Sequence, residues 1–159
     1  MKTEKDEICC PKFDPAPWED QLIEWDKKQF IKGTVRTFIY LPLNFGKVMT
    51  RLDEQITQAT AQSSDCMCLS DHTSKWKMNI YLAVNKPILG CKNTTISGKF
   101  YSKVYEGDFK NTDKWMKESE KAAEQKGYDI QKWYMWYTTC PKCAKKYGKN
   151  YVVILGQLR

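Results

Sequence analysis

The feature that most constrains the fold is an order of secondary structure that occurs twice in the chain. β-branched and aromatic residues predict strands, and apolar residues at helical spacing predict the helices between them. The first repeat, about residues 33–86, is expected to hold a strand at 34–41, a helix at 44–60 and strands at 63–70 and 76–84. The second repeat, about residues 94–159, is expected to hold a strand at 95–106, a helix at 109–125 and strands at 130–139 and 149–158. The chain is therefore predicted to contain two β-α-β-β units.

Two such units predict an α+β fold. Each unit has one apolar sheet face that needs a cover, and two helices on one side of an antiparallel sheet supply it. The opposite, concave side is then free for a ligand cleft between the repeats. Within the first repeat we expect a turn at residues 71–74, where the sequence reads Asp-His-Thr-Ser.

Residues 1–32 read differently from the repeats. Pro11, Pro15 and Pro17 exclude a continuous helix, while several aromatic residues in the same stretch can cover a core. We predict an N-terminal arm packed on the domain formed by residues 33–159, with a short helical turn at residues 17–25.

Composition narrows the class of protein. The 159 residues are 42% apolar, and no apolar run approaches the roughly 20 residues of a membrane helix. The charged N-terminus lacks the pattern of a signal peptide, so we expect a cytoplasmic protein. We also expect a monomer or homodimer without a membrane partner. The net charge of +7 is spread along the chain without a DNA- or RNA-binding motif, so we expect no nucleic-acid partner.

Three segments resemble a known superfamily. Val104-Tyr-Glu-Gly-Asp-Phe-Lys-Asn-Thr-Asp-Lys-Trp115 resembles the strand-turn-helix of GyrI-like small-molecule-binding domains, as does the doubled order of elements. The stretches at 9–18 (CCPKFDPAPW) and 138–151 (TTCPKCAKKYGKNY) resemble a bacterial subgroup labelled hydrolases or uncharacterised proteins. The resemblance implies a cleft for apolar, often cationic, organic molecules. Members commonly place a glutamate in that cleft on a late strand, but the last strand here, Tyr151–Leu155, has no carboxylate.

Aromatic residues are the main candidates for a ligand site. Trp133, Tyr134, Trp136 and Tyr137 alternate on one expected strand, so either face of that strand brings large rings. Such rings suit planar or lipophilic ligands, and core packing is the alternative interpretation. The predicted ligand-binding residues are Tyr40, Trp76, Tyr81, Phe100, Trp115, Trp133, Trp136, Tyr137 and Tyr151.

Hydrolysis of a small organic molecule is left open. Glu106 is a candidate catalytic residue because it lies at the end of an expected strand beside a turn, and Tyr105 or Tyr137 could donate a proton, with core packing as the alternative for the tyrosines. Asp71 and Asp108 are further candidates at turns, and a turn or helix-cap role is the alternative interpretation of all three carboxylates. His72, the single histidine, reads as a surface-turn residue or as a base beside Asp71.

A different class of function rests on cysteine. The chain has seven cysteines, and in a reducing compartment they are expected as free thiols or metal ligands. Cys140 and Cys143 form a C-x-x-C pair that could bind zinc together with Cys9 and Cys10, and Cys66 with Cys68 is a second possible source of ligands. No cofactor is required by the sequence. The prediction is thus a stand-alone binding protein for lipophilic or aromatic compounds, or a detoxifying hydrolase of them; the alternative is a zinc-stabilised interaction protein with a basic partner-binding loop.

Overall fold

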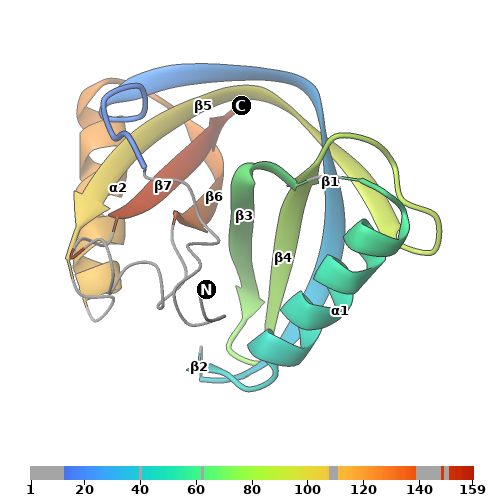
Figure 1. Cartoon of the computed structure of the whole chain (residues 1–159). Helices are drawn as coiled ribbons and strands as arrows, with labels where there is room; N and C mark the ends of the chain where they lie inside the picture. The colour runs from blue at the N-terminus through green and yellow to red at the C-terminus, as the bar shows by residue number, and fades with distance from the viewer. Residues whose placement is uncertain (1–12, 40, 62, 108–110, 139–147, 149–150) are drawn as a thin grey trace.

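The computed structural model describes residues 13–39, 41–61, 63–107, 111–138, 148 and 151–159. Its elements are β1 (Gln21–Phe38), β2 (Leu41–Pro42), α1 (Phe45–Gln58), β3 (Ser63–Ser74), β4 (Lys77–Val84), β5 (Lys92–Glu106), α2 (Thr112–Gln125), β6 (Ile130–Tyr137) and β7 (Tyr151–Leu158). Apart from the two-residue β2, strands and helices follow the order β-α-β-β twice (Figure 1). The predicted duplication is therefore confirmed.

The six long strands form one antiparallel sheet whose ends meet. Neighbouring strands pair in the order β1-β4-β3-β6-β7-β5, and β5 pairs back with β1. β1 and β5, with 18 and 15 residues, arch over both repeats (Figure 1). On the other side, the repeats are joined by a short ladder in which Leu69 lies opposite Trp136 and Ser70 opposite Met135.

Both helices cover the same face of this sheet, which we call the outer face. Leu52 of α1 packs in a cluster with Ile80, and Trp115 of α2 packs in a cluster with Met135. Ile80 lies opposite Ser70, and Ser70 lies opposite Met135. Directly paired residues point to the same face of a sheet, so α1 and α2 lie on one side, as the sequence predicts.

A glycine in β1 lets α1 approach the sheet closely. A Cβ atom at Gly33 would lie 2.9 Å from Cδ1 of Leu52 and 3.0 Å from Cγ1 of Val48. Real side-chain carbons do not come so near, so any larger residue at this position would push the helix outward. Gly33 therefore fixes the spacing between helix and sheet in the first repeat.

The N-terminal part of β1 differs from the expectation. The predicted helical turn at residues 17–25 is wrong: the N–H groups of Trp18 and Glu19 both donate to the carbonyl of Pro15, and β1 then begins at Gln21. Asp20, with φ +52°, adopts a left-handed conformation that no right-handed helix can include. The strand thus begins inside the segment that was predicted as an arm.

The turn expected at residues 71–74 is also wrong. β3 continues to Ser74, with Asp71 opposite Asn79 and His72 opposite Met78. β4 is buried along nearly its whole length, and pairing with such a strand outweighs the turn preference of a short polar stretch.

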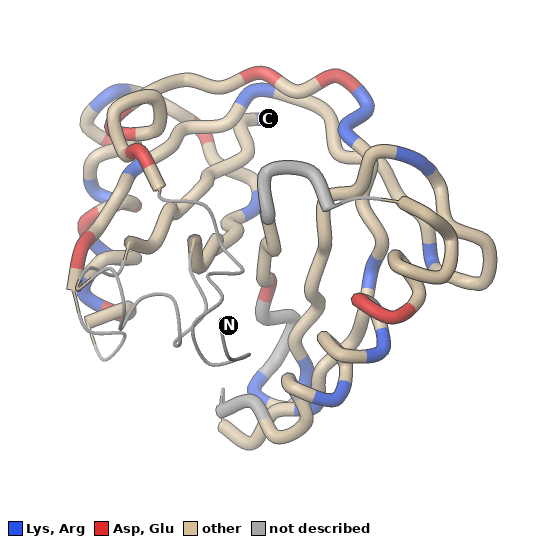
Figure 2. Tube along the Cα trace, in the orientation of Figure 1, with Lys and Arg blue, Asp and Glu red and all other residues tan. Residues whose placement is uncertain are grey.

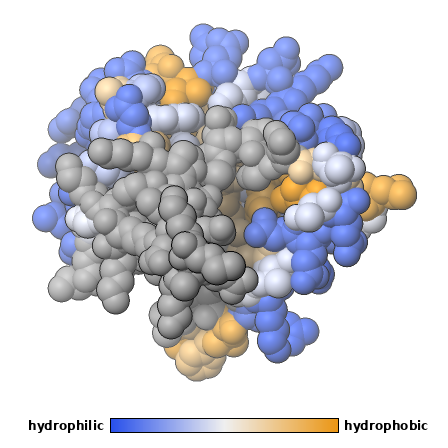
Figure 3. All heavy atoms as spheres, in the orientation of Figure 1, coloured by the Kyte–Doolittle hydropathy of each residue, from blue (hydrophilic) through white to orange (hydrophobic). Residues whose placement is uncertain are grey.

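The surface of the described residues is mainly polar. Lys and Arg are spread over both repeats (Figure 2), and hydrophobic side chains show only in small separate areas of the face drawn in Figure 3. In the part of the chain that the structure describes, neither helix is long and apolar enough to cross a bilayer.

Candidate functional site

The side of the sheet opposite the helices, which we call the inner face, gathers aromatic residues from both repeats. Its buried residues are Phe30, Met67, Leu69, Tyr81, Ala83, Ile96, Phe100, Tyr134, Trp136, Val153 and Leu155. They occupy alternate positions of their strands, which is why they share one face.

Ring contacts on the inner face bridge the two repeats. The rings of Tyr81, from β4, and Tyr134, from β6, meet edge to face at 5.8 Å between centroids. Tyr134 also approaches Phe100 of β5 at 6.4 Å, and Phe100 approaches Trp25 of β1 at 4.7 Å. The inner face therefore offers a continuous aromatic surface rather than isolated rings.

The segment before β1 adds two rings to this surface. Phe13 and Trp18 meet the Trp136 ring edge-on, at 5.4 and 5.0 Å between centroids. Phe13 also lies 5.5 Å from the ring of Tyr151. Trp136 is consequently only 4% exposed, although it lies at the boundary between the repeats.

An ion pair crosses the boundary between the repeats. The ammonium of Lys132, on β6, lies 3.0 Å from a carboxylate oxygen of Asp71, on β3. The same ammonium lies 4.9 Å from the centroid of Tyr134 and 5.7 Å from that of Tyr81. Burial, the largest single effect, lowers the pKa of Lys132, but the hydrogen bond and charge of Asp71 together with the nearby Tyr134 and Tyr81 raise it by more, so the pKa lies above its usual value.

Two more lysines lie over inner-face rings. Lys32 is 5.9 Å from the Tyr81 centroid, and Lys28 is 5.6 Å from that of Trp25. Burial raises the pKa of the Tyr134 hydroxyl, and the neighbouring Lys132 only partly opposes this. The Tyr134 hydroxyl is therefore neutral at physiological pH, while the Lys132 ammonium beside it is charged.

Two buried polar groups on the inner face have no hydrogen-bond partner. Among the described residues, these are the Trp136 indole N–H and the Ser102 hydroxyl. Ser102 lies on β5 opposite Leu155 and is fully buried. A buried polar atom without a partner costs about 1–3 kcal/mol, so such groups are uncommon in folded proteins and are candidates for ligand contacts.

The residues named for the ligand site fall on different faces. Tyr81, Phe100 and Trp136 lie on the inner face, and Tyr151 contacts it through Phe13. In the outer-face cluster are Trp115, which belongs to α2, and Trp133 and Tyr137, which lie on β6 beneath that helix. Trp76 is 57% exposed beside Phe38 at the β3–β4 connection, and Tyr40 lies outside the described residues.

The two predicted catalytic residues lie on opposite faces of β5. The Tyr105 ring stacks on Trp115 at 5.5 Å, its hydroxyl accepts a hydrogen bond from Ser119, and burial raises its pKa. Glu106 is exposed at the end of the strand, and the alternation of β5 places it on the side of the inner face. The structure therefore does not bring these two side chains together.

The predicted zinc ligands lie outside the described residues: Cys9, Cys10, Cys140 and Cys143. Asp108 lies outside them as well. Of the cysteines that are described, Cys68 and Cys91 are free thiols, and burial raises the pKa of Cys68 to about 12. Within the described ranges, no group of three or more potential metal ligands comes together.

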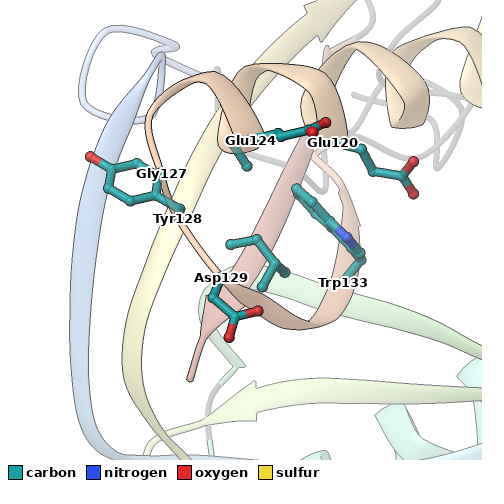
Figure 4. Close-up of a pocket in the computed structure, with 8 residues that line it drawn as sticks. Glu120, Glu124, Gly127, Tyr128, Asp129 and Trp133 are labelled. Carbon is teal, nitrogen blue, oxygen red and sulfur yellow. The ribbon is translucent and has the colours of Figure 1, made fainter.

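A groove on the outside of the second repeat offers a different chemistry. It measures about 390 Å³ and lies between the end of α2 and the start of β6 (Figure 4). Trp133 and Tyr128 line it together with Glu120, Glu124 and Asp129. Asp129 is paired with Arg159, and the two glutamates are exposed. The groove is open to solvent, unlike the buried aromatic surface of the inner face.

The sequence analysis missed Lys132. A lysine near the start of a strand usually faces water, so nothing in its immediate context distinguishes it. The useful signal is its spacing: Lys132, Tyr134 and Trp136 occupy alternate positions and must share a face.

Comparison with known proteins identifies relatives of this fold. A family described as bacterial hydrolase matches residues 1–158. No curated protein matches. Among solved structures, SAV2435 bound to tetraphenylphosphonium is similar with a TM-score of 0.54 at 16% identity, covering 87% of this chain and 93% of the other.

Proposed function

The chain belongs to the bacterial hydrolase family, and from this membership and the inner-face geometry we propose that it binds a bulky, lipophilic aromatic molecule between its repeats. The observation on which the proposal depends is the aromatic surface formed by Tyr81, Phe100, Tyr134 and Trp136. Its rings come from both repeats and are at most 6% exposed, so a ligand would bind by displacing the side chains that cover them.

Two further observations support binding at this face. The unpartnered N–H of Trp136 and hydroxyl of Ser102 are groups that a ligand could satisfy. A protein of similar fold, SAV2435, has been solved with tetraphenylphosphonium, an ion with four phenyl rings. A ligand ring that stacks on Trp136 would replace the ring of Phe13 or Trp18, which now cover it.

Hydrolysis is the second candidate, and the family description favours it. The geometry supports it less directly, because Asp71, the mostly buried carboxylate of the inner face, is already bound to Lys132. Prolonged incubation of the protein with phenyl esters of aromatic carboxylic acids, followed by mass spectrometry, separates the two functions. Product formation above the rate without protein would establish an enzyme.

Calorimetric titration with three phenyl-rich probes of different charge tests binding: tetraphenylphosphonium, triphenylphosphine oxide and tetraphenylborate. We expect saturable 1:1 binding of at least one probe. Tyr134→Leu should weaken it about threefold to tenfold, since one aromatic contact is worth about 0.5–1.5 kcal/mol. Tyr137→Leu is the matched control, because Tyr137 lies on the same strand but on the outer face. Absence of binding by all three probes, or equal weakening by both variants, would contradict the proposal.

A further inference from the structure

The positions at which a cationic ligand would meet the inner-face rings are already taken by the chain's own lysines. Lys132 lies over Tyr134 and Tyr81, and Lys32 lies over Tyr81. An ammonium within about 6 Å of a ring centroid is attracted by the negative ring face. A ligand cation would therefore compete with these side chains for the same ring faces.

The buried carboxylate on this face is also taken. Asp71 has only 11% of its side chain exposed, and Lys132 binds it at 3.0 Å. The raised pKa of Lys132 keeps its ammonium charged at neutral pH. Glu106 lies at the exposed end of β5, where solvent screens its charge. A cation entering the inner face would thus meet the charges of Lys132 and Lys32, and the described residues offer no free buried carboxylate there to offset them.

The two unpartnered polar groups also favour a ligand that accepts hydrogen bonds over a cation. An indole N–H can only donate a hydrogen bond, so Trp136 requires an acceptor. The Ser102 hydroxyl can donate as well, and both groups are buried on the inner face. Oxygen atoms of a carbonyl, phosphine oxide, phenolate or carboxylate would satisfy them, whereas an onium centre would not.

We propose that the inner face selects anionic or neutral, acceptor-bearing aromatic molecules over aromatic cations, and that Lys132 sets this preference. The inference rests on the proposed binding function and specifies the charge of its ligand. It also distinguishes this chain from SAV2435, which was solved with a lipophilic cation.

The size of the effect follows from Coulomb's law. A ligand charge about 6 Å from the Lys132 ammonium, at an effective dielectric constant of about 40, changes the affinity about tenfold. Reversal of the ligand charge doubles that difference in free energy, but counter-ions and Asp71 reduce it. We therefore expect tetraphenylborate to bind at least about tenfold more tightly than tetraphenylphosphonium, with the neutral phosphine oxide between them.

The test is calorimetric titration of the full chain and three variants with these two ions, which have nearly the same shape and opposite charge. Lys132→Met should reverse the preference, because it removes the cation and frees Asp71 to bind one. Lys117→Met changes the net charge equally at an exposed position of α2 and should keep the wild-type preference. The comparison therefore separates the local charge at the inner face from the overall charge of +7.

A second variant covers the case in which Lys132→Met fails to fold because Asp71 is left unpaired. Lys132→Met combined with Asp71→Asn removes both charges and should reduce the tenfold preference to about twofold or less. Three outcomes would contradict part of the proposal. If tetraphenylphosphonium binds the wild-type protein as tightly as tetraphenylborate or more tightly, the charge preference is wrong while the binding function stands. If Lys117→Met and Lys132→Met shift the charge preference equally, Lys132 does not set that preference. If neither ion nor the phosphine oxide binds, the binding function itself fails.

Discussion

The two faces of β6 contain similar residues in very different surroundings. On the outer face, Trp133 and Tyr137 pack with the cluster beneath α2. On the inner face, Tyr134 holds a lysine over its ring, and the N–H of Trp136 is buried without a partner. Aromatic content therefore does not identify a ligand site. On β6 the informative difference is that a helix covers the outer rings, whereas the inner rings lie against the Lys132–Asp71 ion pair and include one buried N–H without a partner.

If the outer face is an ordinary close-packed core, loss of its largest ring should have the largest effect on stability. Trp115 is 6% exposed, and its ring stacks on Tyr105 at 5.5 Å. We expect Trp115→Ala to lower the free energy of unfolding by about 3–5 kcal/mol, measured by urea denaturation followed by circular dichroism. Lys117→Ala, two residues further on the exposed side of α2, should stay within about 0.5 kcal/mol of wild type. A loss below about 1 kcal/mol for Trp115→Ala would remove the contrast between the faces.

Addition of a single carbon atom to the outer face should also destabilise the fold. A Cβ atom at Gly156 of β7 would lie 2.8 Å from the Trp133 ring. Gly156→Ala is therefore expected to destabilise by about 1–3 kcal/mol through overpacking. Gly46→Ala is the matched control, because no atom lies within 4 Å of its added carbon and alanine favours the helix. Thermal melts in which both variants shift in the same direction by similar amounts would refute close packing around Trp133.

Much of the fold could be predicted because its main signals are local. Alternating apolar residues and helical spacing gave the duplicated order, and both are properties of neighbouring residues. The start of β1 could not be predicted in this way. Residues 24–28 are mostly charged, and they form a strand because β1 pairs with β5, about seventy residues later in the chain. Long-range pairing of this kind leaves no mark on the local sequence.

The candidate site was only partly predictable for a related reason. The alternation of Trp133, Tyr134, Trp136 and Tyr137 shows that rings face both sides, but not which side the helix covers. Trp115 and Trp133 were therefore grouped with Trp136, although they pack on the opposite face. Lys132 acquires its significance from Asp71, which lies on another strand in the other repeat.

Beside the outer face, Tyr101, Asp20 and Lys126 form a polar contact that, unlike the buried N–H of Trp136, is satisfied. The hydroxyl of Tyr101 donates to Asp20, whose other oxygen accepts from Lys126 at 3.2 Å. The bond from Tyr101 lowers the pKa of Asp20, outweighing the opposite effect of burial. Because the folded-state pKa is below the unfolded one, the contribution to stability is full above the unfolded pKa of about 4 and is lost as the pH falls through the folded value.

Asp20→Asn keeps the shape and an acceptor oxygen at this left-handed position, so the variant isolates the charge. At pH 6 we expect it to be less stable than wild type by about 1 kcal/mol or less, and the gap should close as the pH falls from about 5 to 3. Melting temperatures across this range measure the gap. A gap that stays constant or widens toward acid would show that the carboxylate of Asp20 is not stabilised in the fold.

Trp136→Phe, the variant with the smallest expected change in stability, tests the inner face most directly. Trp136→Phe removes apolar area, which destabilises, but it also removes a buried N–H that has no partner, which stabilises. These effects oppose each other, so the free energy of unfolding should change by less than about 1 kcal/mol. Trp133→Phe removes the same atoms from a half-buried ring, and the Trp133 N–H is not a buried unpartnered group, so no gain offsets that loss and this variant should be the less stable of the two. The binding of triphenylphosphine oxide should weaken in Trp136→Phe and stay unchanged in Trp133→Phe, because only the first variant removes a donor available to the acceptor oxygen. If Trp136→Phe is the more destabilised variant and binds the phosphine oxide as wild type does, then the indole N–H is a tolerated packing defect and not a ligand contact.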